Sequence, residues 1–201
     1  MTIGERLHDG SLAVGLMKRL ENESRLDWVI SKVAPVVDGL IASKEARGLL
    51  QGRPLGHAAH PLLTDLPLGL WTATNVLDLL PLPGSRQSAQ RLLSLGLVSA
   101  PVVFITGWAE WREAETREQR VGLVHAVLNA SGLALYALSL RSRRRDRHGE
   151  GVVLALGGSV AVAAAGYLGG HLTAVRKVSS YNPEFDSPSS DVPARGMAAH
   201  G

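Results

Sequence analysis

Four histidines are the residues of this chain best suited to bind a metal ion or a haem iron. His57 and His60 stand three positions apart in the stretch "GHAAHPLLTDLPLGLW", and His125 and His171 each fall inside a long apolar segment. Neutral imidazole binds iron, copper and zinc well. Ionisable side chains inside membrane segments are costly and tend to mark functional sites. We therefore take these four histidines as the candidate site.

Two kinds of cofactor fit this set, and the sequence leaves both open. A haem b could take axial ligands from His60, His125 and His171, projecting into a helical bundle from different helices. Asn129 lies one helical turn after His125 and is a candidate hydrogen-bond partner of these ligands. A divalent metal such as copper or zinc would draw on a larger set, in which the carboxylate either binds the metal or fixes an imidazole tautomer. That set is His57, His60, His125, His171 and Asp65.

A third hypothesis needs no cofactor, since histidines can also hydrogen-bond between membrane helices in a structural or anchoring subunit. The His57 and His60 pair does not predict a zinc protease, because Ala58 stands where that motif requires glutamate. Pro61 favours the first turn of a helix, so we expect His60 at the cap and His57 in the preceding loop. The sequence shows no nucleophile triad, phosphate loop or dinucleotide fingerprint. Enzyme activity is left open, with a non-enzymatic role favoured.

Long segments without acidic or basic side chains must position these histidines. Residues 92–109, 121–140 and 151–175 contain no Asp, Glu, Lys or Arg. A hydrocarbon core about 30 Å thick needs about 20 such residues in a helix. Residues 61–82 have similar length, although they include two aspartates. We predict an all-α integral membrane bundle of four transmembrane helices, at about 61–82, 92–110, 121–140 and 151–172.

Short loops between four spans would place the candidate histidines in one layer at one membrane face. An amphipathic, polar head (1–56) is expected before the membrane domain (57–176), and a disordered tail (177–201) after it. No repeat of fixed period is apparent. The chain has no cysteine, and its net charge of +3 with no basic stripe gives no support for nucleic-acid binding. Basic residues are nearly balanced between the two faces, so the sidedness stays open.

Several stretches together resemble one uncharacterised bacterial family of four-helix membrane proteins, frequent in actinobacteria. They include "GRPLGHAAHPLLTDLPLGLW", "ITGWAEW", "RVGLVHAVLNASGLALYALSL" and "GYLGGHL". The family motif G-H-x-x-H-P is present, although relatives more often read G-H-P-L-H-P. The resemblance implies a multi-pass protein of the bacterial inner membrane. Some relatives carry a Rieske-type ferredoxin domain, which implies a redox partner such as a ferredoxin-like protein; the oligomeric state is not indicated.

Overall fold

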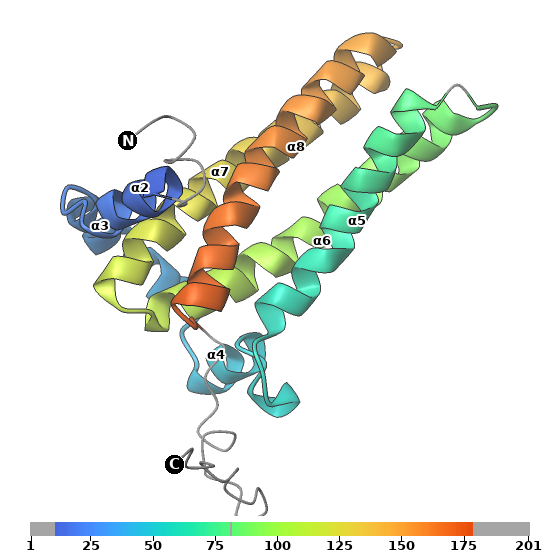
Figure 1. Cartoon of the computed structure of the whole chain (residues 1–201). Coiled ribbons are helices and arrows are strands. Elements are labelled where there is room, and N and C mark those ends of the chain that lie inside the picture. The colour runs from blue at the N-terminus through green and yellow to red at the C-terminus, as the bar shows by residue number, and fades with distance from the viewer. Residues whose placement is uncertain (1–10, 81, 179–201) are drawn as a thin grey trace, which may run out of the picture.

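The computed structural model describes residues 11–80 and 82–178, and every regular element in these ranges is helical. Figure 1 shows two long hairpins whose turns lie at the same end, with the short helices gathered near the opposite end. The elements are α2 (Ser11–Glu21), α3 (Leu26–Leu40), α4 (Lys44–Leu50), η1 (Arg53–Leu55), α5 (Ala59–Leu79), α6 (Ser85–Glu113), α7 (Thr116–Arg143), α8 (His148–Gly170) and η2 (His171–Val175). Helices α5 and α6 form the first hairpin, and α7 and α8 form the second.

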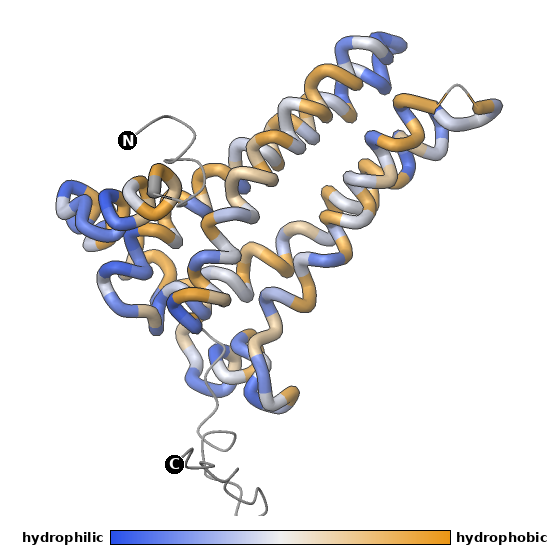
Figure 2. Tube along the Cα trace, viewed as in Figure 1, coloured by the Kyte–Doolittle hydropathy of each residue, from blue (hydrophilic) through white to orange (hydrophobic). Residues whose placement is uncertain are grey.

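Three helices are long and apolar enough to cross a membrane. They are Ser85–Glu113, Thr116–Arg143 and the continuous stretch His148–Val175. The prediction of an all-helical protein with several spans is therefore confirmed. The first hairpin's other helix, α5, carries Asp65 and Asp78 and does not belong to this set, so the fourth span remains a prediction. The described helices α6 and α7 extend past their uncharged segments into charged turns at both ends. Figure 2 shows this pattern at the turn between α7 and α8, where hydrophilic residues gather.

An aromatic stack and a polar cluster join the two hairpins near mid-helix. The rings of Trp71 and Tyr136 stack with centroids 4.3 Å apart. Beside them, Asn75 donates to the Ser159 hydroxyl at 2.5 Å, and the Tyr136 hydroxyl lies 2.9 Å from the same oxygen. Polar side chains that bond across membrane helices hold a bundle together where lipid offers no alternative partner. This cluster therefore fixes one hairpin against the other.

A buried ion pair joins the hairpins close to their turns. Arg143 on α7 binds both carboxylate oxygens of Asp78 on α5, one of them at 2.7 Å, and the two side chains are 1% exposed. Its Nε also donates to the Ser139 hydroxyl at 3.1 Å. Bidentate geometry and a further hydrogen bond are what allow two charges to remain buried. Asp78 and Arg143 thus set the register between α5 and α7.

The two hairpins repeat one pattern of residues. Three positions of α5 recur in α7 exactly 65 residues later: His60 and His125, Trp71 and Tyr136, Asp78 and Arg143. Three positions of α6 recur in α8 after 62 residues: Gly96 and Gly158, Val103 and Ala165, Gly107 and Gly169. The three pairs of α5 and α7 contact each other or lie face to face across the junction of the hairpins. The chain is therefore an internal duplication, contrary to our expectation of no repeat.

Burial follows the same correspondence. Four buried residues of α6, namely Ala89, Leu93, Gly96 and Ala100, match four buried residues of α8, namely Gly151, Ala155, Gly158 and Val162. The hydroxyl of Thr74 contacts the carbonyl of Ala89, and that of Ser139 contacts the carbonyl of Gly151. Helices of each hairpin thus meet in the same way. The shared offset fails by three residues between the two helix pairs, which hides the repeat from a search at one fixed period.

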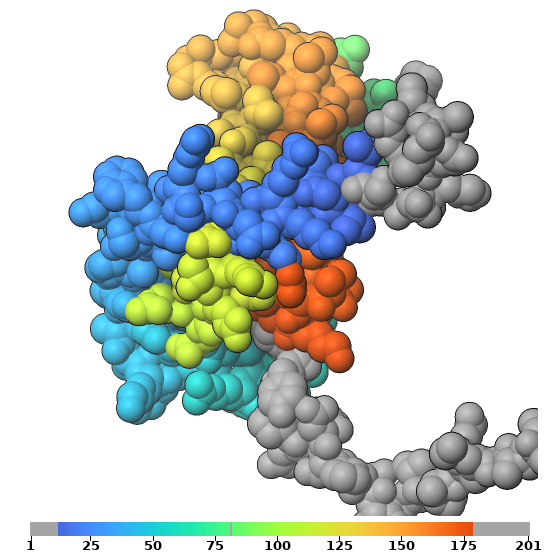
Figure 3. Space-filling view, turned by 60° about the vertical axis from the view of Figure 1, so that its left-hand side comes forward, coloured from blue at the N-terminus to red at the C-terminus, as the bar shows by residue number. Residues whose placement is uncertain are grey.

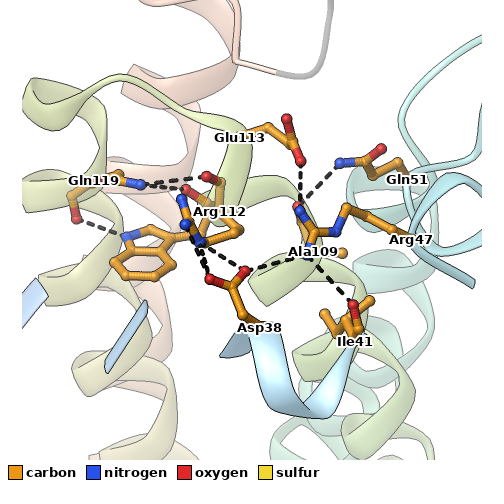
Figure 4. A network of polar contacts seen from close by, with 9 residues as sticks. Asp38, Ile41, Arg47, Gln51, Ala109, Arg112, Glu113 and Gln119 are labelled. Carbon is orange, nitrogen blue, oxygen red and sulfur yellow. Dashed lines mark hydrogen bonds and ion pairs between the residues drawn. The ribbon is translucent and has the colours of Figure 1, made fainter. Parts of the chain in front are cut away.

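The head packs across the end of the bundle where α6 meets α7, as Figure 3 shows. Helix α3 is the predicted amphipathic segment: it runs through Pro35 and buries Ile30 and Val37 against Trp111 and Leu123. A polar network reinforces this contact in Figure 4. Its centre is Asp38, which accepts bonds from Arg112 at 2.9 to 3.1 Å and from Arg47 at 3.2 Å. The arginines hold the pKa of the Asp38 carboxyl below its ordinary value, Arg112 having the larger effect.

Candidate functional site

His60 lies in the first turn of α5 and points its ring toward α6. The helix begins at Ala59 with Ala58 as its cap, so His60 is inside the helix and not at the expected cap position. Its Nδ1 lies 2.9 Å from the carbonyl oxygen of Val103. A carbonyl only accepts hydrogen bonds, so in the neutral ring Nδ1 carries the proton and Nε2 has a free lone pair. Within the described ranges no hydrogen bond occupies that Nε2.

His125 repeats this arrangement in the second hairpin. Its Nδ1 lies 2.8 Å from the carbonyl oxygen of Ala165 on α8, which selects the same tautomer. Asn129 is one turn further along α7, and its amide Nδ2 lies 3.0 Å from His125 Nε2. The predicted contact between His125 and Asn129 is thus present, within one helix.

The two imidazoles face each other across the junction of the hairpins. Their ring centroids are 6.3 Å apart and their planes are inclined by 77°. Each ring rests on a glycine of the neighbouring helix: an added Cβ would lie 2.8 Å from His60 Cε1 at Gly107 and 3.1 Å from His125 Cε1 at Gly169. Glycine is required at both positions because any side chain would displace the ring.

A cavity of about 400 Å³ opens beside the two rings. His60, His125 and Asn129 line it together with aromatic side chains, among them Trp71 and Phe104. Its volume falls in the range of about 300 to 1,000 Å³ typical of small-molecule and cofactor sites.

Three carboxyl groups also line this cavity, from Asp65, Glu110 and Glu118, and no lysine or arginine is among its described lining residues. Glu110 accepts a hydrogen bond from the backbone N–H of His60 at 3.2 Å. The Oε2 atom of Glu118 is buried and has no hydrogen-bond partner in the part of the chain that the structure describes. The cavity is therefore negatively charged at neutral pH.

His171 lies at the same end of the bundle but has a different partner. Its Nε2 is 2.7 Å from a carboxylate oxygen of Glu21, at the end of head helix α2. Arg176 also binds both oxygens of Glu21, one of them at 2.6 Å. The Arg176 guanidinium, aided by His171, holds the pKa of the Glu21 carboxyl below its ordinary value. The structure thus places His171 in the junction between head and bundle, apart from the facing pair.

The remaining predicted ligands lie outside the pair as well. His57 precedes α5, is exposed, and has Nδ1 3.1 Å from the carbonyl oxygen of Ala58. Asp65 is exposed on α5, where it lines the cavity. Among the residues of 11–80 and 82–178, no group of three or more His, Cys, Asp or Glu side chains is arranged to hold a metal ion. The divalent-metal site remains a prediction.

Sequence reasoning missed the two buried glutamates and the stacked pair of Trp71 and Tyr136. Glu110 and Glu118 sit in the charged turn "EWREAETREQR", which reads as a solvated loop when considered alone. The 65-residue offset is the signal that could have found the aromatic pair, because it relates Trp71 to Tyr136 as it relates His60 to His125.

Apolar helices of spanning length and a histidine-lined cavity between them define a multi-pass helical membrane protein. The chain belongs to the family described as "Predicted membrane protein (DUF2231)", whose model matches residues 56–182. The resemblance found in the sequence is thereby confirmed at the level of an uncharacterised membrane family. No curated protein matches the chain, and no solved structure does.

Proposed function

We propose that the protein binds one haem b between its hairpins, with His60 and His125 as axial ligands through Nε2, and that it takes part in one-electron transfer in the membrane. The observation that carries this proposal is the pair of facing imidazoles, each with Nδ1 bound to a backbone carbonyl. A porphyrin supplies four ligands to its iron, so the protein has to provide only two.

The spacing of the rings supports the same assignment. Two imidazoles that bind one metal from opposite sides have centroids about 6 Å apart, because each metal–nitrogen bond measures about 2.0 Å. The observed separation is 6.3 Å. The carbonyls of Val103 and Ala165 hold both rings in the ligating tautomer and increase their basicity. Asn129 would release His125 Nε2 when the ligand binds.

The carboxyl groups of the cavity would set the potential. A haem iron bound there exchanges one electron with a one-electron carrier, for which a ferredoxin-like protein is the expected partner. Negative charge from Glu110 and Glu118 favours the more positive, oxidised iron, so these residues would lower the midpoint potential.

The test is an absorption spectrum of the detergent-purified full chain, expressed with ample haem and reduced with dithionite. We expect a sharp α-band of the b type with about one haem per chain, lost in His60→Ala and in His125→Ala. His57→Ala serves as the matched control and should keep the band. Glu118→Gln should keep it too, with a higher midpoint potential. A spectrum without haem bands, or bands that survive both ligand variants, would overturn the proposal.

One observation favours a structural role as the second candidate. The Nδ1 contacts of His60 and His125 already join helices within each hairpin, and His171 joins the bundle to the head. If this role is the whole function, the protein serves as an anchoring subunit. His60→Ala and His125→Ala would then lower stability equally with and without added haem, and metal analysis would find no copper or zinc.

A further inference from the structure

A second cavity, of about 900 Å³, opens at the other end of the hairpins. It lies between the first turns of α6 and the turn that joins α7 to α8. Arg86, Arg91, Arg143 and His148 contribute to its wall. Neither the histidine pair nor the proposed haem involves these residues, so the cavity calls for a separate explanation.

The arginines of this cavity differ in how their charges are compensated. Arg143 is neutralised by its bidentate pair with Asp78. Arg86 and Arg91 are exposed on α6, and neither forms an ion pair within the described ranges. Asp146 is the acidic residue among the lining side chains. The cavity consequently retains an excess of positive charge and suits an anionic ligand.

The lining changes from basic to apolar with depth along α6. Arg86 and Arg91 occupy its first two turns, and Leu95 and Val98 follow on the lining face, with Val98 about 10 Å beyond Arg91 at 1.5 Å per residue. Leu95 and Val98 are 56% and 76% exposed. A free phosphate would use the basic part alone. A phospholipid has an anionic head followed directly by acyl chains, which matches both parts.

We propose that this cavity binds an anionic phospholipid, with the Arg86 and Arg91 side chains on its phosphate and Leu95 and Val98 against its acyl chains. The proposal rests on the membrane placement of α6 and is independent of the proposed haem. The run of arginines at 141 and 143–145 and at 147 surrounds the same end of the bundle and strengthens the attraction. Basic pockets between membrane helices are known sites of this type.

The test compares lipid binding by the full chain and by Arg86→Gln/Arg91→Gln, using native mass spectrometry of protein in detergent with added phosphatidylglycerol or phosphatidylcholine. We expect the wild type to prefer phosphatidylglycerol. The double variant should bind it about 30-fold more weakly, since each basic residue at a lipid surface contributes roughly a factor of five. Lys32→Gln/Arg117→Gln removes the same charge from exposed residues at the opposite end and should bind like the wild type.

Two results would overturn the proposal. One is equal loss of phosphatidylglycerol binding in both double variants, which would assign the preference to net charge alone. The other is displacement of bound lipid by millimolar inorganic phosphate, which would identify a site for the free anion. Thermal unfolding of both variants, measured without lipid, separates weakened binding from a failure to fold.

Discussion

The two hairpins have the same geometry at equivalent positions, yet they differ in how completely their polar groups are paired. In the second hairpin, the Tyr136 hydroxyl contacts Ser159 and His125 Nε2 contacts Asn129. In the first, Trp71 Nε1 is buried with no partner among the described residues, and His60 Nε2 has none there either. Buried unpaired groups are costly and mark places where a ligand or water belongs. The comparison makes the second hairpin a scaffold and the first the more adaptable half.

The largest effect should come from Asp78, where the two halves carry opposite charges. Asp78→Ala leaves the buried Arg143 unpaired and should cost about 3 to 5 kcal/mol in the free energy of unfolding. Denaturation in detergent micelles would measure it. Asp65→Ala, on the same helix but exposed, is the control and should change stability by less than about 0.5 kcal/mol.

The double variant Asp78→Leu/Arg143→Met removes both charges and should recover most of the loss, because an apolar pair avoids the desolvation of two ions. A cost for Asp78→Ala equal to that of Asp65→Ala would show that the pair does not hold the halves together.

Glycines at equivalent positions should respond unequally. A Cβ at Gly96 would lie 2.3 Å from Trp71 Nε1, whereas at Gly158 the nearest atoms, on Gly132 and Tyr136, are 3.2 Å away. Overpacking typically costs about 1 to 3 kcal/mol, so Gly96→Ala should fall at the upper end and Gly158→Ala at the lower. Gly69→Ala has open space and should be neutral or slightly stabilising. Equal costs at Gly96 and Gly158 would contradict the different packing.

The head should distinguish the halves by pH. Glu21 binds His171, and the equivalent position in the first hairpin is Ala109, whose carbonyl accepts from Gln51. Because the pKa of Glu21 is lowered from 4.5 in the folded protein, its stabilisation is complete above about pH 4.5 and is lost as pH falls through the lowered value.

Glu21→Gln should remove roughly 1.5 to 3 kcal/mol at pH 7, the usual contribution of hydrogen bonds to a charged group, and should flatten the loss of stability under acid. Unfolding free energies at pH 7 and at pH 3.5 would measure both effects. Glu23→Gln, which is exposed, should behave as the wild type does at each pH. A variant at Glu21 with unchanged acid sensitivity would refute the assignment.

The smallest effect should come from Tyr136→Phe. It deletes the contact with Ser159 and keeps the ring stacked on Trp71, so we expect a loss of about 0.5 to 1.5 kcal/mol. A double-mutant cycle with Ser159→Ala would isolate this contact from the other bonds of Ser159. A coupling energy near zero would place the Tyr136 hydroxyl outside the junction.

Local composition was enough to predict the helices and much of the site. Uncharged stretches of 18 to 25 residues leave a membrane helix as the only economical structure, and three such helices are present. His60 and His125 could be proposed because imidazoles near the ends of apolar segments are rare. Their depth along α5 and α7 then followed from helical rise alone.

The remaining contacts depend on tertiary packing that no local pattern encodes. Glu21 and His171 are 150 positions apart, and the head has to dock before they meet. Asp78 and Arg143 each look like a charged helix end in the sequence, and only the register between hairpins turns them into a buried pair. The duplication escaped notice because its halves share few identical residues, and the residues that recur are related by geometry more than by type.

The opposite charges of Asp78 and Arg143 also determine which hairpins can assemble. Two copies of the first hairpin, brought together in this geometry, would bury two aspartates, and two copies of the second would bury two arginines. Only one hairpin of each kind gives a neutral junction. A duplicated hairpin that began as a symmetric pair could in this way lose the ability to pair with itself, so that both halves have to be inherited in one chain.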